Sequence, residues 1–448
     1  MHTKGQDRVR IVTLGCSKNL VDSEVMLHQL RAGGIEASHQ ADELDNEIDV
    51  KPEEEDPNVV IVNTCGFIER AKEESIQTIL QYAGAREEGI IDKLYVTGCL
   101  SHRYKDELKQ EIPEVDAWFG TLELPELLAK FNTDYRHELL GDRQPITPKH
   151  FAYLKISEGC NRTCAFCAIP LMRGKHVSRP IEDLVQEAKN LASNGVQELL
   201  LIAQESTYYG LDLYKERKLP ELLKALAAVP GIEWIRLHYA YPSKFPLEIF
   251  DAMAAHKEVC NYLDIPLQHA ADNVLKAMKR QITNAETRAL LEEARRRVPG
   301  IALRTTMLVG FPGETEEDFE ELVQFVRDIR FDRLGVFPYS HEEGTSGYEL
   351  QDDVPQEVKE DRAARLMAVQ EEISWELNQK RVGGVERVLF DRLEGDFFIG
   401  RTERDSPEVD NEVLVDARTN FVRVGDFADV RIDSVESFDL YGTVFKPD

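Results

Sequence analysis

Three cysteines are packed into one short segment of the chain. The segment "GCNRTCAFC" (159–167) places Cys160, Cys164 and Cys167 at the spacing C-x3-C-x2-C, and no fourth cysteine follows nearby. A closed structural metal site normally has four protein ligands, whereas a catalytic site keeps one coordination position open. The three-thiolate spacing therefore indicates a metal site that does chemistry.

Two kinds of metal fit this segment. Zinc needs a fourth ligand, and His176 is the nearest local candidate, although the chain continues there as "RGKHVSRP" without a second ligand pair. An iron–sulfur cube takes one thiolate per iron, so three cysteines leave one iron open to a substrate or cofactor. The missing fourth cysteine favours the iron–sulfur interpretation.

Three more cysteines each end a run of apolar or β-branched residues. These runs are "VRIVTLGC", "NVVIVNTC" and "KLYVTGC", which end at Cys16, Cys65 and Cys99. Helical patterns lie between them, and strands that alternate with helices predict a mostly parallel sheet. Ligands of such sheets bind beyond the carboxyl ends of the strands. We therefore expect these three thiols to meet at one edge of a doubly wound sheet.

The remaining composition limits where the protein works. A disulfide framework is not expected, because seven cysteines are spread over 448 residues, and we expect Cys260 to be a small core residue. No run of about 18 apolar residues predicts a membrane span, and the N-terminus lacks the apolar segment of a secretory signal. We expect a cytoplasmic protein that does not act at a membrane.

The chain is strongly acidic, with 82 Asp and Glu against 54 Lys and Arg and a formal charge of −28. Such a surface repels a phosphate backbone and attracts basic partners, although adaptation to high salt would give the same charge. Residues 41–57 contain nine acidic residues and one lysine. We interpret them as a solvated loop or insertion, with a docking patch for a basic partner as the alternative.

The middle of the chain predicts six further strands that alternate with helices, one of them at 181–195. The strands are "FAYLKIS", "ELLLIA", "IEWIRLHY", "YLDIPLQH", "IALRTTMLVG" and "RLGVFPYS". Six such units suffice for a partial (β/α)6 barrel with its site at the strand carboxyl ends. The segment "GCNRTCAFC" follows the first strand and so belongs to that face.

The pattern of predicted elements changes in the last part of the chain. A helix is predicted at 355–381 from the apolar stripe Leu366, Val369, Ile373 and Leu377. About five short alternating strands follow after "VGG" (382–384), which predicts a small antiparallel β-barrel of OB-like size. The predicted domains are therefore 1–142, 143–378 and 379–448.

These motifs resemble those of a known enzyme family. "GCNRTCAFC" is similar to the signature of radical S-adenosylmethionine (SAM) enzymes. "TLGCSKNLVDSE", "NTCGFIERAKEES" and "TGCLSHRY" resemble the N-terminal cysteine motifs of the methylthiotransferases within that group. "LDIPLQHAADNVLKAMKR" and "RTTMLVGFPGETEEDF" resemble further blocks of the same family, and the C-terminal barrel resembles its TRAM domain.

The resemblance implies the cofactors. Two [4Fe-4S] clusters, each with an open iron, would be held by Cys160, Cys164 and Cys167 and by Cys16, Cys65 and Cys99. SAM would bind the open iron of the first cluster, and a low-potential electron donor would be needed. The resemblance also offers Phe166, Gly310 and Gly313 as SAM contacts. Places on the predicted barrel strands add Gln204 and Glu205 at the end of the second strand, Gln268 at the end of the fourth and Arg304 in the fifth. Each candidate could instead belong to ordinary packing or a barrel polar network. His238 and His269 could line the pocket, but we expect them to be barrel histidines.

Two branches of this family compete. One modifies an aspartate of small ribosomal subunit protein S-twelve, and the other modifies an adenosine of tRNA. Residues 380–448 carry ten Lys and Arg against sixteen Asp and Glu, which does not suit an RNA-binding barrel. "GRTERDSPEVDNEVLV" (400–415) also resembles the R-x-D-x-P-E-x-D pattern of the aspartate branch. We expect protein S-twelve, bound through the TRAM domain, with tRNA as the alternative.

The family's reaction would use SAM in two roles. One SAM would yield the radical that removes hydrogen from the aspartate β-carbon, and another would donate a methyl group to sulfur carried by the second cluster. An unactivated C–H bond is beyond acid–base catalysis, so this chemistry belongs to the cofactors. The rival classes are a non-enzymatic iron–sulfur sensor, a structural zinc module and a radical SAM enzyme without sulfur insertion.

Overall fold

The computed structural model describes residues 7–40 and 57–445, so all but the last residue of the acidic segment 41–57 lies outside the described residues. The chain forms two compact units. The first comprises Met1–Ile146, Glu158–Arg162 and Ala168–Val177, and the second comprises Thr147–Ser157, Thr163–Cys167 and Ser178–Asp448.

Five parallel strands form the sheet of the first unit, in the order β2-β1-β3-β4-β5. They are β1 (Arg8–Thr13), β2 (Glu36–Gln40), β3 (Val59–Thr64), β4 (Lys93–Gly98) and β5 (Ala117–Trp118). The apolar runs predicted β1, β3 and β4, which are neighbours in the sheet. The two edge strands were missed, because β2 buries only Ala37 and β5 is two residues long.

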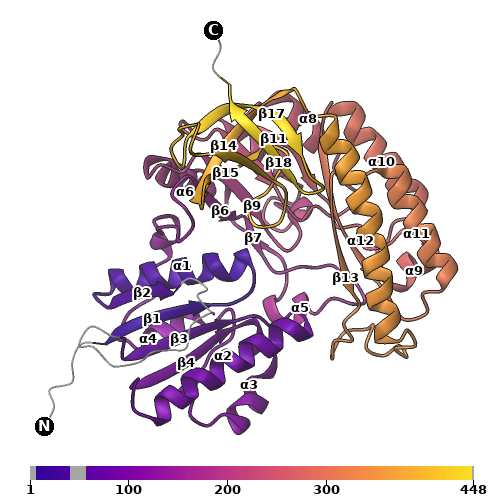
Figure 1. Ribbon diagram of the computed structural model, residues 1–448. Coiled ribbons are helices and arrows are strands. Elements are labelled where there is room, and N and C mark those ends of the chain that lie inside the picture. The colour runs from indigo at the N-terminus through magenta and orange to yellow at the C-terminus, as the bar shows by residue number, and fades with distance from the viewer. Residues whose placement is uncertain (1–6, 41–56, 446–448) are drawn as a thin grey trace, which may run out of the picture. The chain divides into compact units, whose positions relative to one another are not determined.

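Helices cover both faces of this sheet (Figure 1). On one face, α1 (Ser17–Ala32) and α4 (Leu124–Ala129) pack on Val9 and Ile11. On the other, α2 (Glu69–Glu87) and α3 (Cys99–Glu111) pack on Val60 and Val62. Side chains alternate between the two faces along each strand. The predicted doubly wound parallel sheet is therefore confirmed.

Six parallel strands form the sheet of the second unit, in the order β13-β12-β11-β10-β9-β6. They are β6 (Phe151–Lys155), β9 (Glu198–Ile202), β10 (Trp234–Leu237), β11 (Val259–Asp264), β12 (Ala302–Val309) and β13 (Arg333–Pro338). All six were predicted. β6 and β13 are the two edges of this sheet, so the (β/α)6 barrel is partial, as expected.

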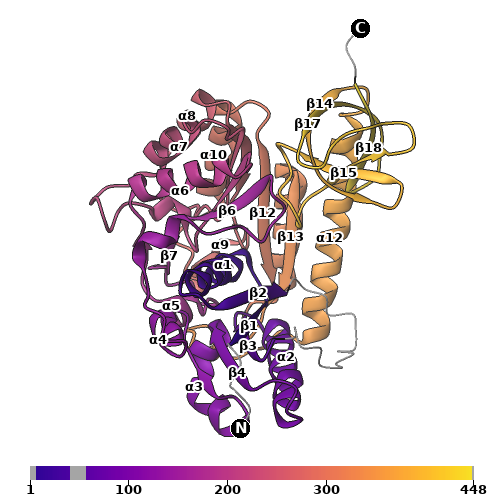
Figure 2. The same cartoon turned by 90° about the vertical axis from the view of Figure 1, so that its left-hand side faces the viewer.

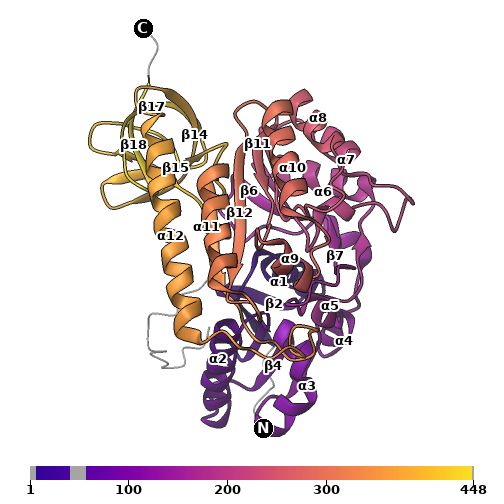
Figure 3. The same ribbon diagram turned by 90° about the vertical axis from the view of Figure 1, so that its right-hand side faces the viewer.

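The outer face of this sheet packs against a layer of helices (Figures 2 and 3). The layer consists of α6 (Ile181–Ser193), α7 (Leu219–Ala227), α8 (Glu248–Ala255), α10 (Asn284–Arg297) and α11 (Glu316–Ile329). A capping box lies at the start of α11: the backbone N–H of Asp318 donates to Thr315 Oγ1 at 3.2 Å, and that of Thr315 donates to the Asp318 carboxylate at 2.9 Å.

The C-terminal part begins with α12 (Gln356–Gln379), whose residues Leu366, Val369 and Ile373 are buried as predicted. The closed barrel that follows consists of β14 (Val385–Glu394), β15 (Phe397–Thr402), β16 (Glu412–Asp416), β17 (Phe427–Val435) and β18 (Asp439–Val444). Its pairs are antiparallel except β16 with β18, which run parallel. The five-stranded OB-like barrel was predicted; alternation along single strands does not reveal which pair is parallel.

This closed barrel packs on the inner face of the six-stranded sheet. Trp234 and Cys260 of that face share a buried cluster with Leu389 and Phe427 of the barrel, and the Trp234 and Phe427 ring centroids are 4.8 Å apart. Cys260 is fully buried, as expected of a small core residue. None of the helices in the described residues is long and apolar enough to cross a membrane.

Candidate active site

The first unit brings Cys16, Cys65 and Cys99 to the same edge of its sheet. Cys16 precedes α1, Cys65 follows β3, and Cys99 is the first residue of α3 directly after β4. The strands β1, β3 and β4 are adjacent and parallel, so their carboxyl ends lie side by side. The loop before α1 approaches Cys65 closely: Gly15 has φ +88°, and a Cβ there would lie 2.7 Å from Cys65 Sγ.

The pKa values of Cys65 and Cys99 are raised by burial and by neighbouring thiols. Burial raises the pKa of Cys65, and an ionised Cys16 raises it further. Burial also raises the pKa of Cys99 to about 12, with added contributions from Cys16 and Cys65. Three thiolates this close to each other therefore need a cationic group among them to remain ionised.

Arg173, in α5 (Ile169–Arg173), supplies positive charge beside these thiols. Its guanidinium group favours the ionised form of Cys99 and, more weakly, of Cys65. It donates hydrogen bonds to Asp22 at 2.7 Å, to Glu158 at 3.2 Å and to Asn19 Oδ1. Sequence reasoning missed Arg173, whose only signal was its place just after the "GCNRTCAFC" segment.

The donor set of the first unit suits an iron–sulfur cluster. Within residues 7–40 and 57–445, no group of three or more His, Cys, Asp or Glu side chains could hold a metal ion. A cluster takes each thiolate on a different iron, so its ligands need not converge on one point. Three neighbouring thiols with an arginine beside them suit an anionic cluster of this kind.

The second cysteine segment lies between β6 and α5. In the second unit, Cys164 Sγ accepts a hydrogen bond from Arg280 Nη1 at 3.4 Å and lies 3.9 Å from the Tyr241 hydroxyl. In the first unit, Cys160 Sγ accepts from the backbone N–H of Arg162 at 3.4 Å. Hydrogen bonds to cluster sulfurs are a main determinant of reduction potential, so these donors suit thiolate ligands.

Arg280 is rigidly placed. It donates to the Pro266 carbonyl, its guanidinium lies 4.4 Å from the Tyr241 ring centroid, and the Tyr241 hydroxyl donates to the Arg280 carbonyl at 2.8 Å. Arg280 is the last residue of "LDIPLQHAADNVLKAMKR", but sequence reasoning gave it no role. Phe166, predicted as a SAM contact, is partly buried against a cluster that includes Phe311 and Tyr339.

Three other predicted SAM contacts follow strands of the second unit. Gln204 and Glu205 come after β9, and Glu205 is buried and accepts a hydrogen bond from Thr207 Oγ1. Gln268 comes after β11 with φ +78°, and its backbone N–H donates to the Thr306 carbonyl at 2.9 Å. All three therefore lie at the carboxyl-end face that the sequence predicted for them.

Gly310 and Gly313, two further predicted SAM contacts, lie in a turn after β12 that is hydrogen-bonded to α12 through Glu314. Gly310 and Gly313 have φ +76° and +83°, a region that favours glycine. The backbone N–H of Gly310 donates to Glu314 Oε2 at 2.6 Å, and Arg362 of α12 donates to Glu314 Oε1 at 3.0 Å. Burial raises the pKa of Glu314 to about 7, although Arg362 and the backbone donors favour its ionised form. Glu314 was not singled out from the sequence.

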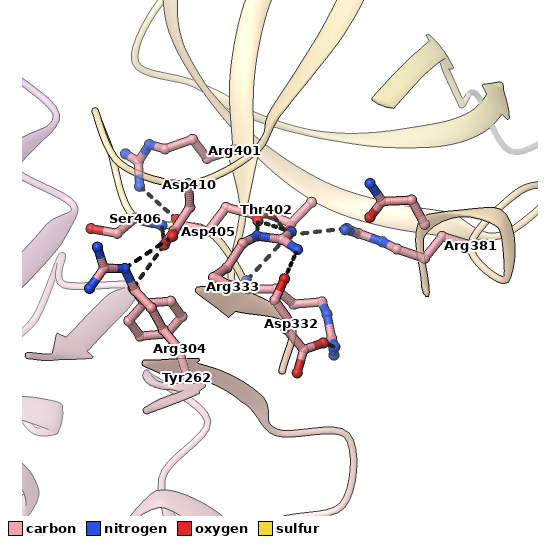
Figure 4. A network of polar contacts seen from close by, with 12 residues as sticks. Tyr262, Arg304, Asp332, Arg333, Arg381, Arg401, Thr402, Asp405, Ser406 and Asp410 are labelled. Atoms are coloured by element: carbon pink, nitrogen blue, oxygen red, sulfur yellow. Dashed lines mark hydrogen bonds and ion pairs between the residues drawn. The ribbon is translucent and has the colours of Figure 1, made fainter. Parts of the chain in front are cut away.

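The last predicted SAM contact, Arg304, has acidic partners from two parts of the second unit. It donates to Asp264 at 2.8 Å. It also donates to Asp410, in the loop between β15 and β16, at 3.2 Å (Figure 4). His238 lies beside them, 3.6 Å from Asp264. His269 lies 3.7 Å from Glu314, and burial lowers its pKa to about 3. Both histidines are in barrel polar networks, as expected.

The segment 400–415 directs its charges toward the six-stranded sheet (Figure 4). Arg401 pairs with Glu198 of β9 at 2.7 Å and with Asp391 of β14 at 2.6 Å. Asp405 accepts from Arg333 of β13 at 2.9 Å. Burial alone would raise the pKa of Glu198, but Arg401 and Arg236 lower it. The segment expected to discriminate substrates is therefore also the attachment of the closed barrel to the sheet.

An open parallel (β/α)6 barrel with a three-cysteine segment after its first strand defines a class of enzyme. Residues 154–326 match the radical SAM superfamily, residues 8–120 match the uncharacterized protein family UPF0004, and residues 382–445 match the TRAM domain. The chain is thus a radical SAM enzyme, with SAM and [4Fe-4S] clusters as its cofactors.

Full-length relatives define the family more narrowly. The chain is 57% identical over 448 residues, covering 100% of both chains, to the ribosomal protein uS12 methylthiotransferase RimO of Cytophaga hutchinsonii. It is 56% identical to the RimO of Flavobacterium johnsoniae over 99% of both chains. The chain belongs to the RimO family of methylthiotransferases.

Solved structures support the fold. The radical SAM methyltransferase TsrM from Kitasatospora setae has a TM-score of 0.52 at 15% identity and covers 74% of this chain and 73% of its own. The cobalamin-dependent radical SAM enzyme OxsB has a TM-score of 0.53 at 11% identity and covers 82% of this chain and 56% of its own. At these identities the likeness concerns the fold alone.

Proposed function

We propose that this protein adds a methylthio group to the β-carbon of an aspartate in ribosomal protein uS12, the protein S-twelve of the small subunit. One SAM serves as the radical source and another as the methyl donor. The observation that carries the proposal is the 57% identity over the full length of a uS12 methylthiotransferase. The acidic C-terminal barrel supports a protein substrate over tRNA.

The six cysteines have two assignments in this proposal. Cys160, Cys164 and Cys167 hold the cluster that binds SAM, and Cys16, Cys65 and Cys99 hold the second cluster. When bound, the clusters and SAM supply the radical and sulfur chemistry. The chain's own residues bind and orient these groups: Arg280 donates to Cys164, and Arg173 places a positive charge beside Cys99.

Phe166, Gln204, Glu205, Gln268, Arg304, Gly310 and Gly313 are the proposed SAM contacts. Their support is unequal, because Arg304 already has Asp264 and Asp410 as partners. The proposed domains are 1–142, 143–378 and 379–448, and the matched ranges 8–120, 154–326 and 382–445 fall within them. A ribosomal substrate and a low-potential electron donor suggest the cytoplasm as the place of action.

The substrate assignment has a direct test. Mass spectrometry of uS12 and of tRNA is compared between cells with and without this gene. We expect the methylthio mass on the aspartate peptide of uS12 to disappear without the gene and to return when the gene is restored. Loss of the modification from tRNA alone would refute the proposal and favour the tRNA branch.

The hydrogen bond from Arg280 to Cys164 has a spectroscopic test. The positive guanidinium group of Arg280 stabilises the reduced cluster more than the oxidised one, because the reduced cluster is more negative. Arg280→Met removes this group and its stabilising effect. If that difference is about 1 kcal/mol, the one-electron potential falls by roughly 40 mV. A redox titration followed by electron paramagnetic resonance of the reconstituted protein measures the shift. Arg296→Met, at an exposed arginine of α10, is the matched control, and equal potentials in both variants would contradict the assignment.

A further inference from the structure

A pocket of about 280 Å³ lies in the second unit, outside the two cysteine sites. It is bounded by α12, by β13 and by the loop that runs from β15 to β16. Gln370 and Ser374 reach it from α12, Asn411 from the loop and Gly335 from β13. The volume is close to the lower end of small-ligand sites in proteins, so it can hold one side chain or a short piece of backbone.

Three residues that line this pocket each have a buried polar atom with no hydrogen-bond partner within the described part of the chain: Gln370 Oε1, Ser374 Oγ and Asn411 Nδ2. Their residues are only 1%, 1% and 3% exposed. The other amide atom of Gln370 donates to the Phe331 carbonyl at 2.9 Å, which leaves its oxygen as an acceptor. Buried polar groups are nearly always hydrogen-bonded, so three in one pocket indicate a bound group with both a donor and an acceptor.

The charged residues of the pocket are already neutralised (Figure 4). Arg304 donates to Asp410, and Arg333 donates to Asp405 at 2.9 Å. The Asp332 carboxylate accepts from the backbone N–H of Leu303 at 2.9 Å and pairs with Arg404. The unsatisfied atoms are all neutral, so the pocket suits a neutral group rather than an ion.

Apolar side chains surround the polar interior. Val409 and Phe438 line the pocket and are 56% and 42% exposed. Met367 adds a flexible thioether from α12. Exposed apolar residues beside buried hydrogen-bonding groups are typical of surfaces that bind protein chains.

We propose that this pocket binds a neutral peptide group of the protein substrate, apart from the aspartate that is modified. The N–H of the peptide group donates to Gln370 Oε1, and its carbonyl accepts from Asn411 Nδ2. A neighbouring apolar side chain packs on Val409 and Phe438. This inference rests on the proposed function, because it takes uS12 as the bound chain.

Two variants test the pocket by different means. Gly335→Val fills it, because a Cβ at Gly335 meets only Phe337 Cε2 at 3.8 Å, and valine is favoured in strands. The double variant Ser374→Ala with Asn411→Ala removes two hydrogen-bonding groups. The matched control is Ser434→Ala, an exposed serine of the same closed barrel. Each is made in the full chain and reconstituted anaerobically.

The dissociation constant for labelled uS12 is the readout. We expect it to rise about tenfold or more in both pocket variants and to stay within about twofold in the control. The thermal midpoint of the free double variant should be equal or higher, because the lost groups had no partner in the free chain. Wild-type affinity in the pocket variants overturns the proposal, and a small neutral molecule as the true occupant would give that result.

The failure of this inference can be told from failure of the proposed function. If the wild-type chain does not methylthiolate uS12, the proposed function fails. If it does and the pocket variants bind uS12 as tightly as wild type, only the pocket assignment fails. If one pocket variant does not fold, the dissociation constant of the other variant for uS12 tests the pocket assignment.

Discussion

Replacing Cys16, Cys65 and Cys99 together by alanine is expected to reduce methylthio transfer to the level of a no-enzyme control, while SAM is still cleaved. The reason is that the two sets of three cysteines lie in different segments of the chain and next to different strands. These three thiols follow β1, β3 and β4 of one sheet, whereas the other three lie in the segment after β6. Loss of one thiol set removes the ligands of one proposed cluster and leaves those of the other intact.

Two products are measured in the same reaction mixture. Chromatography quantifies 5′-deoxyadenosine from SAM, and mass spectrometry quantifies the methylthio group on uS12. Iron content should fall by about half, because one of two clusters is lost. Cys260→Ala is the matched control, since Cys260 is buried beside Trp234 and belongs to neither set. Methylthiolation retained by the triple variant would refute the assignment of the second cluster.

The second large effect is on stability. Arg401→Met is expected to destabilise the protein by about 3–5 kcal/mol, because it leaves buried charges without a partner. Arg401 is 1% exposed and holds Glu198, which is 0% exposed, and Asp391. Urea unfolding followed by tryptophan fluorescence measures the change, since Trp234 lies where the closed barrel meets the sheet. Limited proteolysis should also cut the C-terminal barrel faster.

The control is Arg418→Met, which breaks an exposed pair with Asp416 on the same barrel. An exposed pair contributes less than about 1 kcal/mol, so this variant should resemble wild type. The lowered pKa of Glu198 means that its stabilising contribution is present above the ordinary pKa of a glutamate and is lost as the pH falls through the folded value. In Arg401→Met, the pKa of Glu198 in the folded state is less depressed, so the part of the stability that is lost on acidification should be smaller than in wild type. Equal stability of both variants would contradict the role given to Arg401.

Most of the fold could be predicted from the sequence, because its signal is local. β1, β3 and β4 are rich in apolar and β-branched residues, and the six strands of the partial barrel are also rich in apolar residues. The capping box at Thr315 could be found within four residues. The edge strand β2 could not, because "EASHQ" buries one side chain and receives its place from pairing with β1.

The charged residues around the site could not be predicted in the same way. Arg280 contacts Cys164 across 116 positions of the chain, and Arg173 meets Asn19 across 154. Nothing local distinguishes such an arginine from one on the surface. For Arg304, the sequence indicated a role that the structure does not single out. Its position on a strand predicted a contact with SAM, whereas its guanidinium group donates to Asp264 and Asp410.

The ion pairs between the closed barrel and the sheet also limit how this enzyme can be rebuilt. Arg401, Asp405 and Asp410 are matched to Glu198, Arg333 and Arg304 on the other side of the junction. A chimera that receives the C-terminal barrel of another enzyme would bury charges of one side without their complements. The charged residues of the closed barrel and of the sheet are therefore matched to each other. A graft intended to change the substrate should exchange both partners of each ion pair together.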